Sequence, residues 1–197
     1  MKSFVIFATT ILLVLVTSPQ IGAEEIEKPS TDPRPLWSVD AEQSRLEFSA
    51  TQNGKAFKGE FTDFEAKIVF DPEDLPSSSI DVFVDMTSAE TGDRQRDDAF
   101  PSGDWFKTKE FPKAHFSASD IVATDNGYYE AKGTLTIRDV KRELVLPFSL
   151  EIDGPSARAE GKITIVRTDF GVGQGVFSEG KWVGLDVSVG FVILANK

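Results

Sequence analysis

Few side chains in this sequence are of the types that carry out acid–base or nucleophilic chemistry. His115 is the only histidine, and it falls at a polar position beside Phe116 in an alternating run. Without a second histidine, a Ser–His–Asp triad and a zinc site both have little support. The absence of cysteine excludes disulfides, thiol nucleophiles and thiolate metal ligands. We therefore predict no catalytic residue, no metal ligand and no cofactor.

Four aspartates, Asp93, Asp97, Asp98 and Asp104, form an acidic patch. Their spacing does not match the signature of a calcium loop. We interpret them as solvated residues that cap short helical turns. No pair of carboxylates stands out for glycoside chemistry, so a hydrolase is the third of the functions that we consider.

The segment RTDFGVGQG, residues 167–175, contains the Asp-Phe-Gly letters of protein kinases. No glycine-rich loop, strand lysine or catalytic-loop motif accompanies these letters, which excludes a kinase. Its glycines lie between two β patterns with no helix for a phosphate to cap, which argues against a nucleotide-binding loop. We predict a long flexible loop.

The elements that position these residues are strands with one apolar face. Within residues 133–153, apolar residues recur at every second position, for example at Leu144, Leu146 and Phe148. This strict period of two is typical of β-strands, and it runs through most of the chain from Trp37 onward. We predict an all-β fold: an extended, up-and-down antiparallel β-barrel of about eight strands with a short helical flap.

Turn residues separate the predicted strands. Asn53-Gly54 is a strong signal for a two-residue hairpin, and DPEDLPSSS, residues 71–79, ends another strand. Pro147 lies inside a strand pattern, so we expect a bulge there or a missing hydrogen-bond partner.

One long segment, residues 87–112, lacks alternation and predicts the flap. Asp93 and Ser102 are both candidate N-caps, which predicts two short helical turns. The buried side of the flap would come from four aromatic residues: Phe100, Trp105, Phe106 and Phe111. Two interpretations stay open, because the flap could close the mouth of a barrel or simply plug its end as core.

Small residues recur at inward positions, namely Ala50, Gly59, Ala66, Ala118, Ala131, Gly133, Ala159 and Gly161. An eight-stranded barrel is just wide enough to be filled by large side chains. A lining thinned by alanine and glycine would therefore leave a cavity, which we favour. The alternative is that these residues allow neighbouring strands to approach closely at barrel corners.

The candidate ligand-binding residues are inward aromatic and aliphatic side chains, with two more expected at the mouth, Phe106 and Phe170. The inward set is Phe48, Phe61, Ile68, Val84, Met86, Phe116, Leu135, Phe148, Ile163 and Leu185.

The N-terminus has the pattern of a targeting segment. Lys2 precedes an apolar run that is shorter than the about 20 residues of a membrane span, and Ala23 ends a plausible cleavage site. We predict a signal peptide over residues 1–23, a flexible Pro-rich leader over 24–36 and one barrel domain over 37–197. Export predicts a periplasmic or secreted protein without stable membrane insertion after cleavage. The net charge of −11 argues against nucleic acid as a partner.

Five segments together resemble the YceI-like family of exported, lipocalin-like barrel proteins. They are WSVDAEQSRLEFSA, KGEFTDFEAKIVFDPED, TGDRQRDDAFPSGDWFKTKEFPKAHF, GTLTIRDVKRELVLPFSL and RTDFGVG, in this order between about Trp37 and Leu194. The resemblance implies a carrier or sequestering protein that binds an isoprenoid or other long-chain lipid, with no catalytic residues.

The chain departs from the family pattern at two places. Family members often carry a histidine where this chain has Gln52-Asn53-Gly54, and another in the flap where it has Ala99. Trp105 is bulkier than the aromatic residue expected there, and we expect it to narrow the pocket.

The function predicted from the sequence is the holding of a long apolar or amphiphilic chain inside the barrel, for transport, storage or sequestration. Candidate ligands are isoprenoids, isoprenoid quinones and fatty-acid derivatives. The alternative is a ligand-free barrel that serves as an interaction module for an envelope protein. A homodimer, paired through barrel edges, is also open.

Overall fold

Eleven antiparallel strands form one sheet in the computed structural model, which describes residues 36–197. The predicted signal peptide and the leader up to residue 35 lie outside the described residues. The strands are β1 (Leu36–Val39), β2 (Arg45–Gln52), β3 (Lys55–Phe61), β4 (Phe64–Val69), β5 (Ser79–Asp85), β6 (Ala89–Glu90), β7 (Lys113–Ala123), β8 (Tyr128–Ile137), β9 (Val140–Asp153), β10 (Ser156–Val166) and β11 (Asp186–Asn196). The helical elements are α1 (Arg94–Ala99) and the short 3-10 turns η1 (Leu75–Ser77), η2 (Met86–Ser88), η3 (Asp125–Gly127), η4 (Arg167–Phe170) and η5 (Gly175–Phe177).

Eight of these strands close into a ring, in the order β1-β4-β5-β7-β8-β9-β10-β11 and back to β1. The short strand β1 completes the ring because it pairs on both sides. Trp37 lies opposite Ile68 of β4, and Val39 lies opposite Ala195 of β11. The strands β2, β3 and β6 extend the sheet from the edge of β11. The predicted eight-stranded antiparallel barrel with a short helix is therefore confirmed.

Alternation along the ring separates an apolar inner face from a polar outer face. Phe116 of β7 pairs with Leu135 of β8, and both line the interior. One residue away, Thr134 pairs with Glu143 of β9, and the Thr134 hydroxyl donates a hydrogen bond of 2.6 Å to its carboxylate. The apolar and polar residues that alternate in the sequence therefore point to the inside and the outside of the barrel, respectively.

A predicted hairpin turn and a predicted interruption of strand pairing both have the expected geometry. Asn53 and Gly54, between β2 and β3, both have positive φ angles (51° and 74°), as a type I′ hairpin turn requires. Pro147 pairs with Glu130 of β8, but the ladder between β9 and β10 ends one residue away, at Phe148 opposite Gly161. Pro147 therefore sits where no partner needs its missing N–H.

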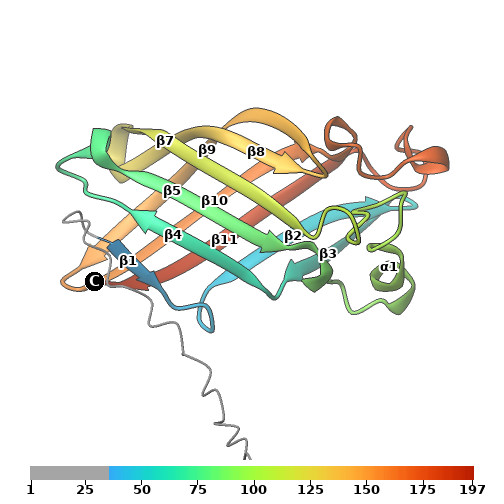
Figure 1. Cartoon of the computed structure of the whole chain (residues 1–197), viewed down its shortest axis with the longest axis horizontal. Helices are drawn as coiled ribbons and strands as arrows, with labels where there is room; N and C mark the ends of the chain where they lie inside the picture. Colours follow the sequence, from blue (N-terminus) through green and yellow to red (C-terminus); the bar gives the residue numbers. More distant parts are fainter. Residues whose placement is uncertain (1–35) are drawn as a thin grey trace, which may run out of the picture. The chain divides into compact units, whose positions relative to one another are not determined.

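β1 and the C-terminus lie at the same end of the barrel (Figure 1). Aromatic side chains of the main hydrophobic core pack around β1. The Trp37 indole donates a hydrogen bond of 3.0 Å to the Phe70 carbonyl. The Phe70 ring lies 5.3 Å from Tyr129 and 6.3 Å from Phe148 between ring centroids. This cluster belongs to the main hydrophobic core, so it closes this end of the interior.

The flap lies at the other end and contains one helix, not two helical turns. Asp93 caps α1 as predicted, because its carboxylate accepts hydrogen bonds from the amides of Gln95 and Arg96. Ser102 does not cap a helix: its carbonyl accepts from the amides of Trp105 and Lys107, within a series of turns. The prediction of a second helical turn was therefore wrong.

The flap packs an aromatic cluster onto the barrel end. Phe100 is buried and lies 6.0 Å from Phe48 of β2 between ring centroids, while Phe106 lies 6.2 Å from Phe61 of β3. Trp105 packs against Phe100 at 6.3 Å and is not among the residues that line the cavity, so it does not narrow the pocket. Of the two interpretations of the flap, the packing supports a plug of core.

The segment between η4 and β11 folds around one buried cation. Arg167 is only 3% exposed, and its guanidinium donates hydrogen bonds to the carbonyls of Val172 and Gly173 at one nitrogen. Its other nitrogens reach the carbonyls of Phe177, Val183 and Gly184. Burial lowers the pKa of Arg167. Residues 167–175 were predicted as a long flexible loop. In the structure they begin with η4, and the carbonyls of Val172 and Gly173 hold the Arg167 charge, which lacks a carboxylate partner.

Two glycines in this segment give a matched test. Both Gly173 and Gly175 have positive φ angles (81° and 59°), so alanine costs about 1–2 kcal/mol of backbone strain at either position. A Cβ at Gly173 would also overlap the Arg167 guanidinium, whereas a Cβ at Gly175 meets nothing within 4 Å. We expect Gly173→Ala to lose about 1–3 kcal/mol more unfolding free energy than Gly175→Ala in urea titrations. Equal losses would show that Arg167 does not organise this segment.

A second test concerns the start of the flap. The hydroxyl and the amide of Thr87 donate hydrogen bonds of 2.6 and 2.7 Å to Asp85, and they lower the pKa of that carboxyl. The stabilisation is therefore present above the unfolded pKa and is lost as pH falls through the folded pKa. Thr87→Val should raise the pKa of Asp85 in an NMR titration and reduce stability at neutral pH more than in acid. Thr62→Val, which removes a hydroxyl bonded only to a carbonyl, should leave the Asp85 pKa unchanged.

Candidate ligand-binding cavity

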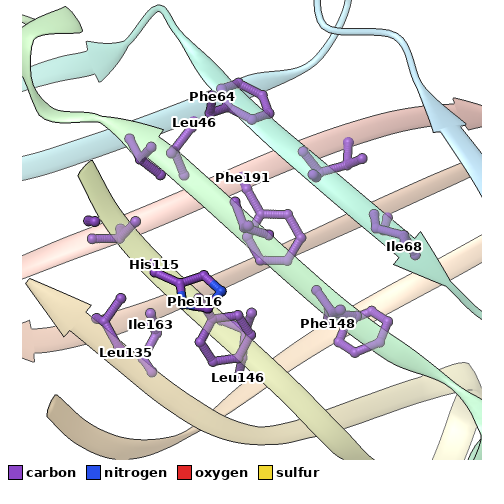
Figure 2. Close-up of a pocket in the computed structure, with 18 of the residues that line it drawn as sticks. Leu46, Phe64, Ile68, His115, Phe116, Leu135, Leu146, Phe148, Ile163 and Phe191 are labelled. Carbon is purple, nitrogen blue, oxygen red and sulfur yellow. The ribbon is translucent and has the colours of Figure 1, made fainter. Parts of the chain in front are cut away.

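A cavity of about 220 Å³ lies inside the ring. Side chains from opposite strands point into it, among them Phe116, Leu146, Phe148 and Phe191 (Figure 2). All the residues that line it are apolar except His115. The cavity is larger than the engineered apolar cavity of about 150 Å³ that stays dry and binds benzene.

The one polar residue at the cavity makes its side-chain contacts on the outer face. His115 Nε2 lies 3.1 Å from a carboxylate oxygen of Asp81. Its ring stacks on Phe83, with centroids 4.1 Å apart and an angle of 2° between the planes. Asp81, Phe83 and His115 all occupy outward positions in the paired strands β5 and β7. The lone histidine therefore supplies no side-chain chemistry to the interior.

Small residues serve both of the purposes that the sequence left open. Ala66 and Ala159 line the cavity, where a larger side chain would take up space. In contrast, a Cβ at Gly59 would overlap the Phe48 ring, and one at Gly161 would come within 2.8 Å of the Phe191 ring. The glycines therefore accommodate close neighbours, while these alanines leave room inside the barrel.

Eight of the twelve predicted binding residues line the cavity: Phe61, Ile68, Val84, Met86, Phe116, Leu135, Phe148 and Ile163. The other four do not. Phe48 and Phe106 belong to the aromatic cluster under the flap. Phe170 is buried in η4, and Leu185 precedes β11, where it packs beside Gly180. Alternation identifies the inward face but not the position along the barrel axis, which explains why Phe48 and Leu185 were predicted to line the cavity; Phe106 and Phe170 were predicted at the mouth.

Other residues that line the cavity also occupy inward positions of their strands but were not among the predicted binding residues. Trp37, Leu46, Phe64 and Phe191 come from strands whose alternation was recognised, so the signal was present. The sequence did not reveal the strand pairing: β1 closes the ring and brings Trp37 to the same interior as Phe191, and β2 pairs Leu46 directly with Phe191.

The interior offers no charged group for acid–base work. Asp85 and Arg167, whose pKa values are lowered, both lie outside the lining. Within residues 36–197, no group of three or more His, Cys, Asp or Glu side chains is placed to hold a metal ion. In the same part of the chain, no helix has the length and apolarity needed to cross a membrane.

Comparison with known proteins gives consistent matches. The family model described as the YceI-like domain matches residues 37–195. Among solved structures, BcnA of Burkholderia cenocepacia is 28% identical with a TM-score of 0.78, over 81% of this chain and 100% of that chain. A YCEI protein of Campylobacter jejuni is 27% identical with a TM-score of 0.61, over 72% of this chain and 85% of that chain.

A more distant structure shares the fold. A polyisoprenoid binding domain from Saccharophagus degradans, implicated in plant cell wall breakdown, has a TM-score of 0.65 at 15% identity, over 81% of this chain and 97% of that chain. Among curated relatives, a UPF0312 protein of Vibrio cholerae is 28% identical over 51% of this chain and 54% of its own length. Protein YceI of Escherichia coli O157:H7 is 28% identical over 57% of this chain and 65% of its own length. The chain thus spans about half the length of the Vibrio relatives that it matches.

Adjacent residues of β9 test whether apolar molecules enter this cavity. Leu146 lines it, whereas Val145 faces outward and is 44% exposed. We expect Leu146→Asp to weaken binding of the apolar fluorophore N-phenyl-1-naphthylamine at least tenfold, because an apolar ligand would desolvate the carboxylate. Val145→Asp should change the affinity for the fluorophore less than twofold. Leu146→Trp, which fills the cavity without a charge, should also weaken binding, and unchanged binding in both folded Leu146 variants would place the probe elsewhere.

Proposed function

The chain belongs to the YceI-like domain family, and on this premise we propose that it holds a long apolar or amphiphilic chain inside its barrel. The candidate ligands are isoprenoids, isoprenoid quinones and fatty-acid derivatives, and the role is transport, storage or sequestration. The observation that carries this proposal is the cavity, whose inward side chains are all apolar. The polyisoprenoid binding domain of Saccharophagus degradans, which shares the fold, supports the same ligand class.

The hydrophobic effect is sufficient for such binding. Burial of about 500 Å² of hydrocarbon contributes about 12 kcal/mol before costs. Loss of translational and conformational freedom offsets several kcal/mol of this, which leaves micromolar affinity or better. The side chains that point into the cavity are apolar, so they discriminate chain width and length.

We also propose that the protein is exported, to the periplasm or beyond. The basis is the sequence pattern of residues 1–23, an apolar run after Lys2 that ends in small residues. Intact mass of the protein recovered outside the cytoplasm would show a chain that begins at Glu24. A chain of full length there would contradict cleavage after Ala23.

A second candidate function is an interaction module for an envelope protein. The observation that favours it is the segment between η4 and β11, where Val176 is 71% exposed and Trp182 is 49% exposed. Large exposed apolar side chains mark a contact surface where they gather into one patch. A hydrolase has no comparable support from the described residues.

The test of the proposed function is native mass spectrometry of the protein expressed with its own N-terminus, followed by organic extraction. We expect a stoichiometric mass excess that extracts as a prenyl or acyl chain. The double variant Ala66→Leu, Ala159→Leu, which fills the cavity, should lose this mass, while Ala41→Leu in an exposed turn should keep it. A clean apo mass for the wild type, with no uptake of added geranylgeraniol or palmitic acid, would favour the interaction module.

A further inference from the structure

The ring is not hydrogen-bonded along its whole length. β10 pairs with β11 over all of Ser156–Val166, but it pairs with β9 only over Ser156–Gly161. β9 pairs with β8 over 140–149. The register of that ladder would place residues 143–147 of β9 opposite 162–166 of β10, but these two stretches are not paired. Residues 140–142 of β9 lie beyond the end of β10, which η4 follows.

This break is bounded at both ends. At one end is the last pair of the ladder, Phe148 opposite Gly161, with Pro147 next to it. At the other end, the Arg138 guanidinium donates a hydrogen bond of 2.7 Å to the Trp105 carbonyl and another to the Gly171 carbonyl. These bonds tie the β8–β9 turn to the flap and to the segment after η4, and we call the unpaired stretch between these two ends the window.

The window borders the cavity. Leu144 and Leu146 of β9 lie on one side of it, and Ile163 and Ile165 of β10 lie on the other. All four line the cavity, so a chain inside the barrel lies directly behind the unpaired strand edges.

A cation occupies an inward position at the end of this window that adjoins the β8–β9 turn. Arg142 pairs with Leu135 of β8, which lines the cavity, so Arg142 occupies an inward position of β9. In the paired registers of the eight ring strands within residues 36–197, it is the one charged residue at an inward position. A charge at such a position conflicts with the apolar pattern of the ring, and this calls for a functional explanation.

Arg142 also differs from other arginines of the described chain in having little else to bind. Its guanidinium is exposed and donates one hydrogen bond of 2.9 Å, to the neighbouring Lys141 carbonyl. No carboxylate of the described residues lies within 4.0 Å of it, whereas Arg158 pairs with Glu160 at 2.7 Å. Most of the five N–H donors of Arg142 are therefore available to a ligand.

The ladder has a second break, between β4 and β2. β4 pairs with β1 only at Ile68 and Val69, so Phe64–Lys67 lacks a partner on that side. The inward residues near this break, Phe64 and Leu46, are apolar and line the cavity. This second break therefore offers nothing to a polar head.

From this arrangement we infer that the ligand is an amphiphile with an anionic head, a phosphate or a carboxylate, that Arg142 binds at the window between β9 and β10. The inference rests on the proposed function, since it requires an apolar chain in the cavity. Arginine presents paired N–H donors that match two oxygens of such a head. The chain lies among the apolar side chains, and the head stays at the strand edges in contact with water.

The test compares ligands that differ only in the head. Dissociation constants are measured by isothermal titration calorimetry for geranylgeranyl phosphate against geranylgeraniol, and for palmitate against hexadecanol. We expect the wild type to bind the anionic member of at least one pair at least tenfold more tightly. The pair with the larger ratio distinguishes a phosphate from a carboxylate.

Two variants assign the preference to Arg142. Arg142→Gln should reduce the ratio to less than threefold while binding of the neutral alcohol stays within twofold, which also shows that the barrel is folded. Lys162→Gln removes an equal charge from an outward position of β10 beside the window and should preserve the ratio.

The outcomes separate this inference from the proposed function. Tight binding of all four ligands without a preference, or a preference that survives Arg142→Gln, would overturn the head-group site and leave the proposed function standing. Failure of all four ligands to bind would overturn both.

Discussion

The ring of backbone hydrogen bonds that β1 completes between β4 and β11 is the constraint on which the rest of the structure depends. Closure pairs β1 on both of its sides, so neither end of the ring is left as a free strand edge along β1. It also directs every second side chain of eight strands into one interior. The apolar positions that look independent along the chain, such as Trp37, Leu135 and Phe191, therefore line a single cavity.

The two ends of the ring are closed by different means, and the space is left between them. Trp37, Phe70, Tyr129 and Phe148 pack at the end that holds β1, while the flap cluster around Phe100 packs at the other end. A barrel without a ligand to hold would gain stability from large side chains at Ala66 and Ala159, because unfilled volume costs stability. Their small size is in keeping with an interior shaped for an apolar guest.

Much of the fold could be predicted from the sequence because strand alternation and turn chemistry are local. The period of two gave the strands and their inward faces, and Asn53-Gly54 gave a hairpin. Contacts along the barrel axis are not local, and so Phe48 was assigned to the cavity although it packs under the flap. The buried position of Arg167 was not predicted, because its partners are backbone carbonyls, which leave no pattern of side-chain types in the sequence.

The departure of Arg142 from the apolar pattern is visible in the sequence only once the register is known. Within GTLTIRDVKREL it looks like part of a charged turn, because Arg138, Asp139, Lys141 and Glu143 surround it. The pairing with Leu135 is what places it in the inward row. The strand register, which decides which side chains face inward, distinguishes Arg142 from its charged neighbours.

The central claim is that an apolar chain occupies the interior between the two aromatic clusters. The most direct measurement is a crystal structure of the protein grown with geranylgeraniol. We expect continuous electron density for the ligand inside the ring, in contact with Leu146, Phe116 and Phe191. Clear protein density with an empty interior, or with the ligand bound only on the outer face, would contradict it.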